Sequence, residues 1–167
     1  MKIFTIMQRD WAKYYGLPLV EKIKNKYPNF VIDTLVYKIS TYNLIKKRKD
    51  LFNKVWLGYK YDDNIFDENI KKKLEKISIK EIESTLQIES VWKNLIHVDR
   101  SIIYTPGKKF RYSFRKQVSD KDALSIVKLN YLLVKDKIFG EDKPDVIILP
   151  NFGSIFHNVL YHYAKIK

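Results

Sequence analysis

The residues best suited to chemistry lie near the carboxyl end of the sequence, in a turn between two apolar runs. The turn is Asn151-Phe152-Gly153-Ser154, and His157 follows it closely. A glycine in such a turn lets the backbone approach a ligand, and the N–H groups that begin a helix can bind an anion or a sugar hydroxyl. We therefore predict that Asn151, Gly153 and Ser154 bind substrate. The equally weighted alternative is that Gly153 only permits the turn and Ser154 only caps a helix.

His157 is the candidate catalytic base of this turn. It should lie in the first turn of a helix, where the helix dipole disfavours the protonated imidazole and lowers its pKa. A neutral imidazole that faces a cleft can act as a general base. The alternative, more frequent at such positions, is a packed or surface histidine. His162 is five residues further along, a spacing that does not place two imidazoles side by side for a metal ion, so no metal site is predicted.

The segment Gln8–Gly16 is a second candidate, because it carries a carboxylate, two cations and three aromatic side chains. Aromatic faces beside polar groups suit sugar rings, whose CH groups stack while their hydroxyls form hydrogen bonds. We predict that Arg9 and Trp11 bind substrate and that Asp10 accepts a proton. In the alternative, Asp10 only pairs with Arg9 or Lys13.

A third group, formed by Glu89, Trp92 and Asp99-Arg100, is interpreted as an internal ion pair beside a core tryptophan. The sequence contains neither Gly-x-Gly-x-x-Gly, nor a P-loop lysine, nor a Gly-x-Ser-x-Gly frame. These motifs mark dinucleotide, nucleoside triphosphate and serine hydrolase sites. No cofactor is therefore predicted for this chain.

Apolar runs predict the elements that hold these residues: an α/β fold with a Rossmann-like parallel sheet of three to four or more strands. The expected strands are Lys2–Met7, Phe30–Tyr37, Val55–Tyr59 and Val146–Leu149. The last is expected to be buried on both faces. Helices are expected from Pro18 to about Tyr27, from a Thr41 cap to Lys49, and after Ser154. Parallel sheets bind ligands at the carboxyl ends of their strands, so both candidate segments are predicted at one edge.

Residues 65 to 118 interrupt this alternation and are predicted to form an insertion in a single domain of residues 1–167. Asn69–Lys76 and Lys80–His97 have helical patterns, and Arg100–Gln117 is expected to be a loop or a small hairpin around Pro106-Gly107. A capping box at Ser119 is expected to begin a further helix that ends at Gly140. The residues expected to be buried in that helix are Leu124, Val127, Tyr131, Val134 and Ile138.

The chain of 167 residues has no cysteine and a formal net charge of +13. Such a charge favours anionic partners, but the lysines are scattered through a sequence that is also rich in isoleucine, asparagine and tyrosine. A solvated surface is therefore favoured over a nucleic-acid site. The sequence has no evident targeting segment and no apolar run long enough to span a membrane. We expect a cytoplasmic protein and leave open its association with the inner face of the cell membrane.

Several stretches of the sequence together resemble one known family. They are Lys2-Ile3-Phe4, the segment from Glu89-Ser90-x-Trp92 to Asp99-Arg100, and Ile138-Phe139-x-x-x-Lys143-Pro144-Asp145-Val146-Ile147 with Asn151-x-Gly153-Ser154 and a helix ending Tyr163-Ala164-Lys165. The chain resembles, loosely and over most of its length, the amino-terminal half of bacterial and archaeal surface- or capsular-polysaccharide biosynthesis proteins with the two-domain glycosyltransferase-B fold.

This resemblance implies the acceptor-binding half of a glycosyltransferase, inactive alone, in which Asp10 or His157 accepts the proton of the acceptor hydroxyl. The implied partners are a sugar or lipid-linked glycan acceptor, an anionic membrane surface, and a missing carboxy-terminal domain or separate chain that binds the nucleotide-sugar donor. The chain would then be one incomplete half of a two-domain fold. The alternatives are half of a sugar-nucleotide epimerase, a non-catalytic Rossmann-like binding or partner module, and, less favoured, a nucleic-acid binder.

Overall fold

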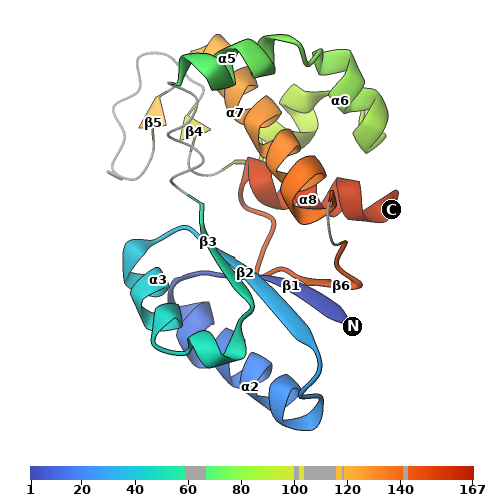
Figure 1. Cartoon of the computed structure of the whole chain (residues 1–167). Coiled ribbons are helices and arrows are strands. Elements are labelled where there is room, and N and C mark those ends of the chain that lie inside the picture. The colour runs from blue at the N-terminus through green and yellow to red at the C-terminus, as the bar shows by residue number, and fades with distance from the viewer. Residues whose placement is uncertain (59–66, 100–101, 104–115, 118, 141–142) are drawn as a thin grey trace. The chain divides into compact units, whose positions relative to one another are not determined.

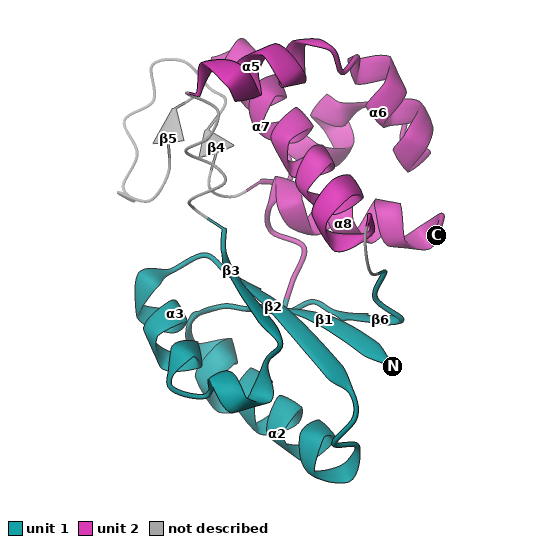
Figure 2. Ribbon diagram, viewed as in Figure 1, with its two compact units in different colours: residues 1–61, 142–150 teal, residues 62–141, 151–167 magenta. Residues whose placement is uncertain are grey.

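The structure is a computed structural model that describes residues 1–58, 67–99, 102–103, 116–117, 119–140 and 143–167 (Figure 1). The chain divides into two compact units, each built from two separate stretches. Unit 1 comprises residues 1–61 and 142–150, and unit 2 comprises residues 62–141 and 151–167 (Figure 2). The predicted insertion, residues 65–118, lies within unit 2, which also includes the helices on either side of residues 142–150.

Unit 1 contains a four-stranded parallel sheet, which confirms the predicted α/β, Rossmann-like fold class. Its strands are β1 (Lys2–Met7), β2 (Val31–Val36), β3 (Lys54–Leu57) and β6 (Val146–Ile148). They lie in the order β3-β2-β1-β6, and every adjacent pair is parallel. The chain moves from β1 to β2 and β3 on one side, whereas β6 lies on the other side of β1. The switch point of the topology is therefore between β1 and β6.

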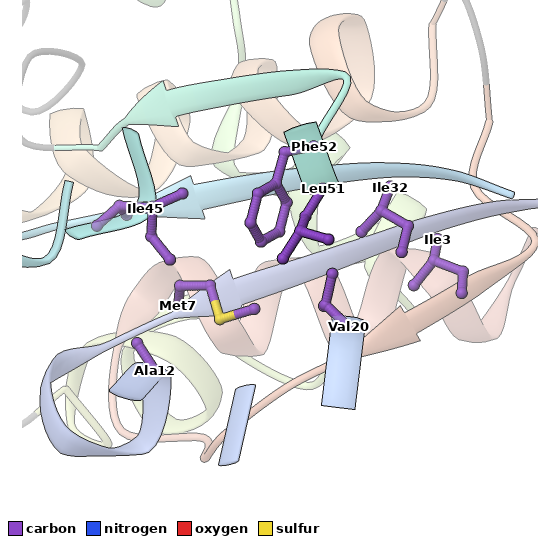
Figure 3. Close-up of a cluster of buried hydrophobic side chains, with 9 residues drawn as sticks. Ile3, Met7, Ala12, Val20, Ile32, Ile45, Leu51 and Phe52 are labelled. Carbon is purple, nitrogen blue, oxygen red and sulfur yellow. The ribbon is translucent and has the colours of Figure 1, made fainter. Parts of the chain in front are cut away.

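Helices cover one face of this sheet (Figure 1). They are α1 (Arg9–Trp11), the π-helical η1 (Ala12–Gly16), α2 (Leu17–Lys26), α3 (Ile39–Lys46) and the 3₁₀ turn η2 (Lys49–Leu51). Figure 3 shows the core between sheet and helices, which is built from alternate residues of the strands. Strand residues contribute Ile3, Met7, Ile32 and Val36, and the covering segments contribute Ala12, Val20, Ile45, Leu51 and Phe52.

Two predictions about these elements are wrong. Thr41 does not cap α3: the helix begins at Ile39 after an extended Lys38, and Thr41 is buried inside it. The run Val146–Leu149 is not buried on both faces, since β6 pairs only with β1 and Val146 is 39% exposed. An aliphatic run of this kind is equally compatible with a strand at the edge of the sheet.

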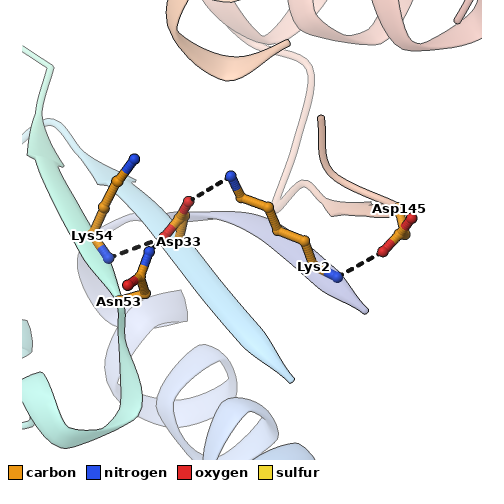
Figure 4. Close-up of polar contacts among 5 residues, drawn as sticks. All are labelled: Lys2, Asp33, Asn53, Lys54 and Asp145. Atoms are coloured by element: carbon orange, nitrogen blue, oxygen red, sulfur yellow. Dashed lines mark hydrogen bonds and ion pairs between the residues drawn. The ribbon is translucent and has the colours of Figure 1, made fainter. Parts of the chain in front are cut away.

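A buried aspartate links the amino ends of the four strands (Figure 4). Asp33 of β2 is fully buried, and its Oδ1 accepts hydrogen bonds from Asn53 Nδ2 (2.9 Å) and the backbone N–H of Lys54 (3.0 Å). Its Oδ2 lies 3.2 Å from Lys2 Nζ, an ion pair without hydrogen-bond geometry. The backbone N–H of Lys2 in turn donates to Asp145 Oδ2 at 2.7 Å, just before β6. The ion pair and these hydrogen bonds thus hold β1, β2, β3 and β6 together at their amino ends.

Unit 2 is mainly helical. Its elements are α5 (Glu68–Glu75), α6 (Ile79–Leu86), the π-helical η4 (Trp92–Ile96), α7 (Asp120–Leu132), which continues into the π-helical η5 (Leu133–Ile138), α8 (Ile155–Lys165), and the strands β4 (Ile102–Ile103) and β5 (Lys116–Gln117). Helix α7 packs against α5, α6, α8 and η4 and so lies at the centre of the unit.

The sequence patterns predicted the positions of most of these helices but not the residues at which a helix is interrupted. The Ser119 cap of α7 is confirmed, because its Oγ accepts from the backbone N–H of Asp122. The helix expected over Lys80–His97 is interrupted at Gln87, whose φ of 53° is left-handed and ends α6. Of the loop or small hairpin expected over Arg100–Gln117, the hairpin alternative is contradicted, because β4 and β5 pair in parallel, whereas hairpin strands are antiparallel. Its expected centre, Pro106-Gly107, lies outside the described part of the chain.

We predict that Asp33→Ala lowers the free energy of unfolding by about 2–4 kcal/mol, because the backbone N–H of Lys54 and the Asn53 amide lose their buried acceptor and Lys2 loses its counter-charge. Urea denaturation measures the change. The matched control is Asp50→Ala, whose carboxylate is 64% exposed and lies 3.5 Å from the Arg48 guanidinium. Exposed ion pairs contribute little, so this control should cost about 0.5 kcal/mol or less. Equal losses in the two variants would contradict the role given to Asp33.

Candidate functional site

The first candidate segment, Gln8–Gly16, follows β1 at the switch point of the sheet. The backbone from Arg9 to Lys26 is continuously helical through α1, η1 and α2. Pro18 cannot donate a hydrogen bond to the carbonyl of Tyr14, and its ring crowds that carbonyl. The helix widens to a π turn just before it, with the N–H of Leu17 bonded to the carbonyl of Ala12. Such π turns recur at functional sites.

Local strain and close packing fix the beginning of this segment. Arg9 has a φ of 44°, in the left-handed region that disfavours residues with a Cβ. Gly16 is required for a different reason, since a Cβ there would lie 2.6 Å from Cζ3 of Trp11 and would also collide with Met7 Sδ. The Trp11 ring is thereby held, half-buried, against the π turn.

The remaining polar and aromatic groups of this segment face solvent. Arg9 and Asp10 are exposed, and Tyr14 and Tyr15 are 60% and 67% exposed. Lys13 Nζ lies 4.9 Å from the centre of the Tyr14 ring and 3.4 Å from its hydroxyl oxygen. An exposed aromatic face, a carboxylate and cations thus occur together after β1. This combination can stack on a sugar ring and hydrogen bond with its hydroxyls.

The second candidate segment, which precedes α8 in unit 2, is held by hydrogen bonds within itself. Asn151 Oδ1 accepts from the N–H of Gly153 at 3.0 Å. Ser154 caps α8, as predicted, and its Oγ accepts from the N–H of His157 at 3.3 Å. Asn158 Nδ2 donates to the carbonyls of Phe152 and Ser154, both at 2.8 Å. These contacts show that the turn and the Ser154 cap have a structural role, which was the alternative to substrate binding in the sequence analysis. Substrate binding by the turn stays a prediction.

His157 lies inside unit 2 and is only 1% exposed. Its Nδ1 is 2.5 Å from Ser154 Oγ, and its ring lies edge-on to Phe156 at 6.3 Å. Loss of hydration lowers its pKa from 6.5 to about 4, so the imidazole is neutral at pH 7. The sequence indicated a lowered pKa but assigned it to the helix dipole. A buried imidazole does not face a solvent-filled cleft, which the proposed base would need to do.

Sequence reasoning missed the contact that holds the start of α8. Asp99 is buried, and its Oδ2 accepts from the backbone N–H of Ile155 at 2.8 Å. A carboxylate at this position satisfies a helix-terminal donor and favours the positive end of the helix dipole. The sequence only grouped Asp99 with Glu89, Trp92 and Arg100 around an internal ion pair, and Arg100 lies outside the described residues. The bond joins residues 56 positions apart, so no local pattern could reveal it.

The predicted site residues therefore form two groups. Arg9, Asp10 and Trp11 belong to unit 1, and the other group, in unit 2, consists of Asn151, Gly153, Ser154 and His157. Among the described residues, no three side chains of His, Cys, Asp or Glu come together in a way that could hold a metal ion. Within the same residues, no helix combines the length and apolar character that crossing a membrane requires. The exposed chemistry is concentrated in the first group.

Comparisons with protein-family models, curated proteins and solved structures gave no match.

We predict that burial of His157 makes the protein less stable in acid. Between about pH 6.5 and pH 4 the unfolded chain takes up a proton that the folded imidazole does not, so stability falls as pH falls. The free energy of unfolding should drop by about 2 kcal/mol from pH 7 to about pH 4.5 through this group. Urea denaturation across this pH range measures how steeply the free energy of unfolding depends on pH. The variant His157→Gln should remove most of this dependence.

The matched control is His162→Gln on the same helix. Burial and, to a smaller extent, the positive charge of Lys165 lower the pKa of His162. The side chain of His162 is, however, only half-buried. This variant should change the slope less than His157→Gln does. An unchanged slope in His157→Gln would contradict the buried, neutral histidine.

Proposed function

We propose that unit 1 binds the carbohydrate acceptor in a glycosyl transfer reaction of cell-surface polysaccharide biosynthesis. The observation that carries the proposal is the group Arg9, Asp10, Trp11 and Tyr14, which follows the central strand β1 directly. Parallel sheets bind ligands at the carboxyl ends of strands beside a switch in topology, the position that this group occupies. Exposed rings with a carboxylate and a guanidinium suit a sugar better than they suit an apolar ligand.

Tyr14 and Lys13 would form the platform for the sugar ring. The tyrosine ring is 60% exposed, so one face can accept the CH groups of a pyranose. Lys13 lies against the same ring and donates toward its hydroxyl, which limits the ring's movement. Arg9 and Asp10 supply a donor and an acceptor for sugar hydroxyls beside it. The helical backbone fixes where these side chains begin, so no backbone has to be ordered on binding.

Asp10 is the group that we assign to proton transfer. The acceptor hydroxyl oxygen would form a bond to the anomeric carbon of a nucleotide sugar while the bond from that carbon to the phosphate oxygen breaks. The hydroxyl proton would pass to the Asp10 carboxylate, and the nucleoside diphosphate would leave. His157 is the weaker candidate, because it is 1% exposed and its burial lowers its pKa to about 4.

The donor would be held by a further domain or a separate chain. The sequence lacks the glycine-rich and P-loop motifs that commonly bind nucleotide phosphates. A lipid-linked acceptor at the inner face of the cell membrane fits the net charge of +13, since anionic lipid surfaces attract basic proteins. Catalysis would therefore require this chain together with the donor-binding partner.

We predict that the purified chain binds one or more saccharides from a panel of mono- and oligosaccharides in saturation-transfer NMR. Tyr14→Ala should weaken that binding about five- to tenfold, because a stacked ring contributes about 1–1.4 kcal/mol. The matched control is Tyr27→Ala. Tyr27 is also exposed, at 44%, but stacks on Phe30 at 4.6 Å after α2 and outside the candidate group. Absence of any saccharide binding, or equal effects of the two variants, would contradict the proposal.

A second prediction concerns the donor. Titration calorimetry of this chain with UDP-glucose and GDP-mannose should give no Kd below about 1 mM, because the sequence contains neither a Gly-x-Gly-x-x-Gly motif nor a P-loop lysine to bind the diphosphate. A parallel titration with the best saccharide of the panel shows that the sample is active. Micromolar binding of a nucleotide sugar would refute the assignment of the donor to another domain or chain.

A further inference from the structure

We propose that the outer side of the helical segment after β1 binds an anionic lipid surface. The side is a stripe of four residues, Tyr15, Leu19, Lys22 and Lys26, which recur at spacings of four, three and four along a continuous helix. Residues at these spacings lie on one side of a helix. We call these four residues the Tyr15–Lys26 stripe.

Every member of the stripe is exposed, although two of them are apolar or aromatic. Tyr15 is 67% exposed and Leu19 is 40% exposed. Val20, one position further on, is 1% exposed and packs in the core between sheet and helices, so α2 already has a different side for its apolar contacts. Leu19 is not among the residues of that core, and its exposed surface remains available to a partner.

The charges beside these apolar groups are positive. Lys22 and Lys26 are exposed. The nearby carboxylate of Glu21 is engaged by Arg48, with Nη2 3.1 Å from Oε1, and so does little to neutralise the lysines. Lys26 lies over the Tyr27 ring at 5.3 Å, which adds a third aromatic or apolar group, next to Tyr15 and Leu19. A complementary partner must be negatively charged and must also accept an aliphatic side chain.

An anionic membrane surface meets both requirements. Leucine inserts among acyl chains, tyrosine lies at the level of the headgroups, and lysine stems extend along the apolar boundary while their ammonium groups reach lipid phosphates. Single-stranded nucleic acid would use the lysines and the tyrosine, whereas a leucine adds neither charge nor base stacking to that mode of binding. Leu19 therefore favours a lipid surface.

Vesicle co-sedimentation tests this surface. The full chain should bind phosphatidylcholine vesicles containing about 30% phosphatidylglycerol at least about tenfold more tightly than pure phosphatidylcholine vesicles. Lys22→Gln/Lys26→Gln should weaken the binding about 10- to 30-fold, since each basic residue near the surface contributes about fivefold. Leu19→Gln should weaken it about fivefold, while circular dichroism shows that the fold is retained.

The matched control is Lys72→Gln/Lys73→Gln, which removes the same charge from exposed positions of α5 in unit 2. It should change binding less than about threefold if the stripe is the docking surface. Equal losses in the two double variants would overturn the proposal in favour of diffuse charge attraction. Tight binding to an arbitrary RNA oligonucleotide that depends on Lys22 and Lys26 but not on Leu19 would overturn it in favour of nucleic acid.

Lipid binding and acceptor binding are tested separately. Leu19, Lys22 and Lys26 lie outside the group Arg9, Asp10, Trp11 and Tyr14, and the vesicles contain no glycan. Loss of lipid binding with retained saccharide binding would overturn only the membrane surface. Loss of saccharide binding with retained lipid binding would overturn only the acceptor site.

Discussion

The ion pair between Asp33 and Lys2 is the constraint on which the sheet unit depends. A carboxylate with no exposed surface is stable only when an ion pair or hydrogen bonds compensate its charge. The partners that satisfy it come from β1 and from the residues that begin β3, so burial of one charge fixes the register of three strands. The bond from Lys2 N–H to Asp145 extends this order to β6. Because the amino ends of the strands are tied in this way, the loops at their carboxyl ends can vary without loss of the sheet.

In unit 1, irregular backbone follows β1 directly, at the end of the sheet opposite this network. A left-handed Arg9, a π turn ahead of Pro18 and a Gly16 packed against Trp11 follow one another within a few residues. Each of these features is less stable than regular helix, and each persists only because the surrounding core holds it. The result is a helical segment that exposes Asp10 and Tyr14 to solvent at the switch point of the sheet.

The sequence predicted those features that depend on neighbouring residues. The run Lys2–Met7 forms β1 with the predicted bounds, and Ser119 and Ser154 cap their helices, because apolar periodicity and capping act over a few positions. Features that depend on distant residues were missed. Asp33 is the one charged residue of β2, and its partners come from two other strands. Asp99 contacts a backbone group 56 residues away. Neither partner set could be derived from spacing along the chain.

The candidate site was predictable in its residues but not in their environments. Both Asp10 and His157 were plausible bases from residue type and position alone. Burial separates them, because the imidazole is enclosed among unit 2 residues with Ser154 at its Nδ1, whereas the carboxylate faces solvent at the end of β1. A base must reach a proton on a ligand before its pKa becomes relevant. His157 instead combines with Ser154 and Asp99 to fix the start of α8. The assignment of proton transfer to Asp10 thus rests on exposure, a property that no pattern along the sequence specifies.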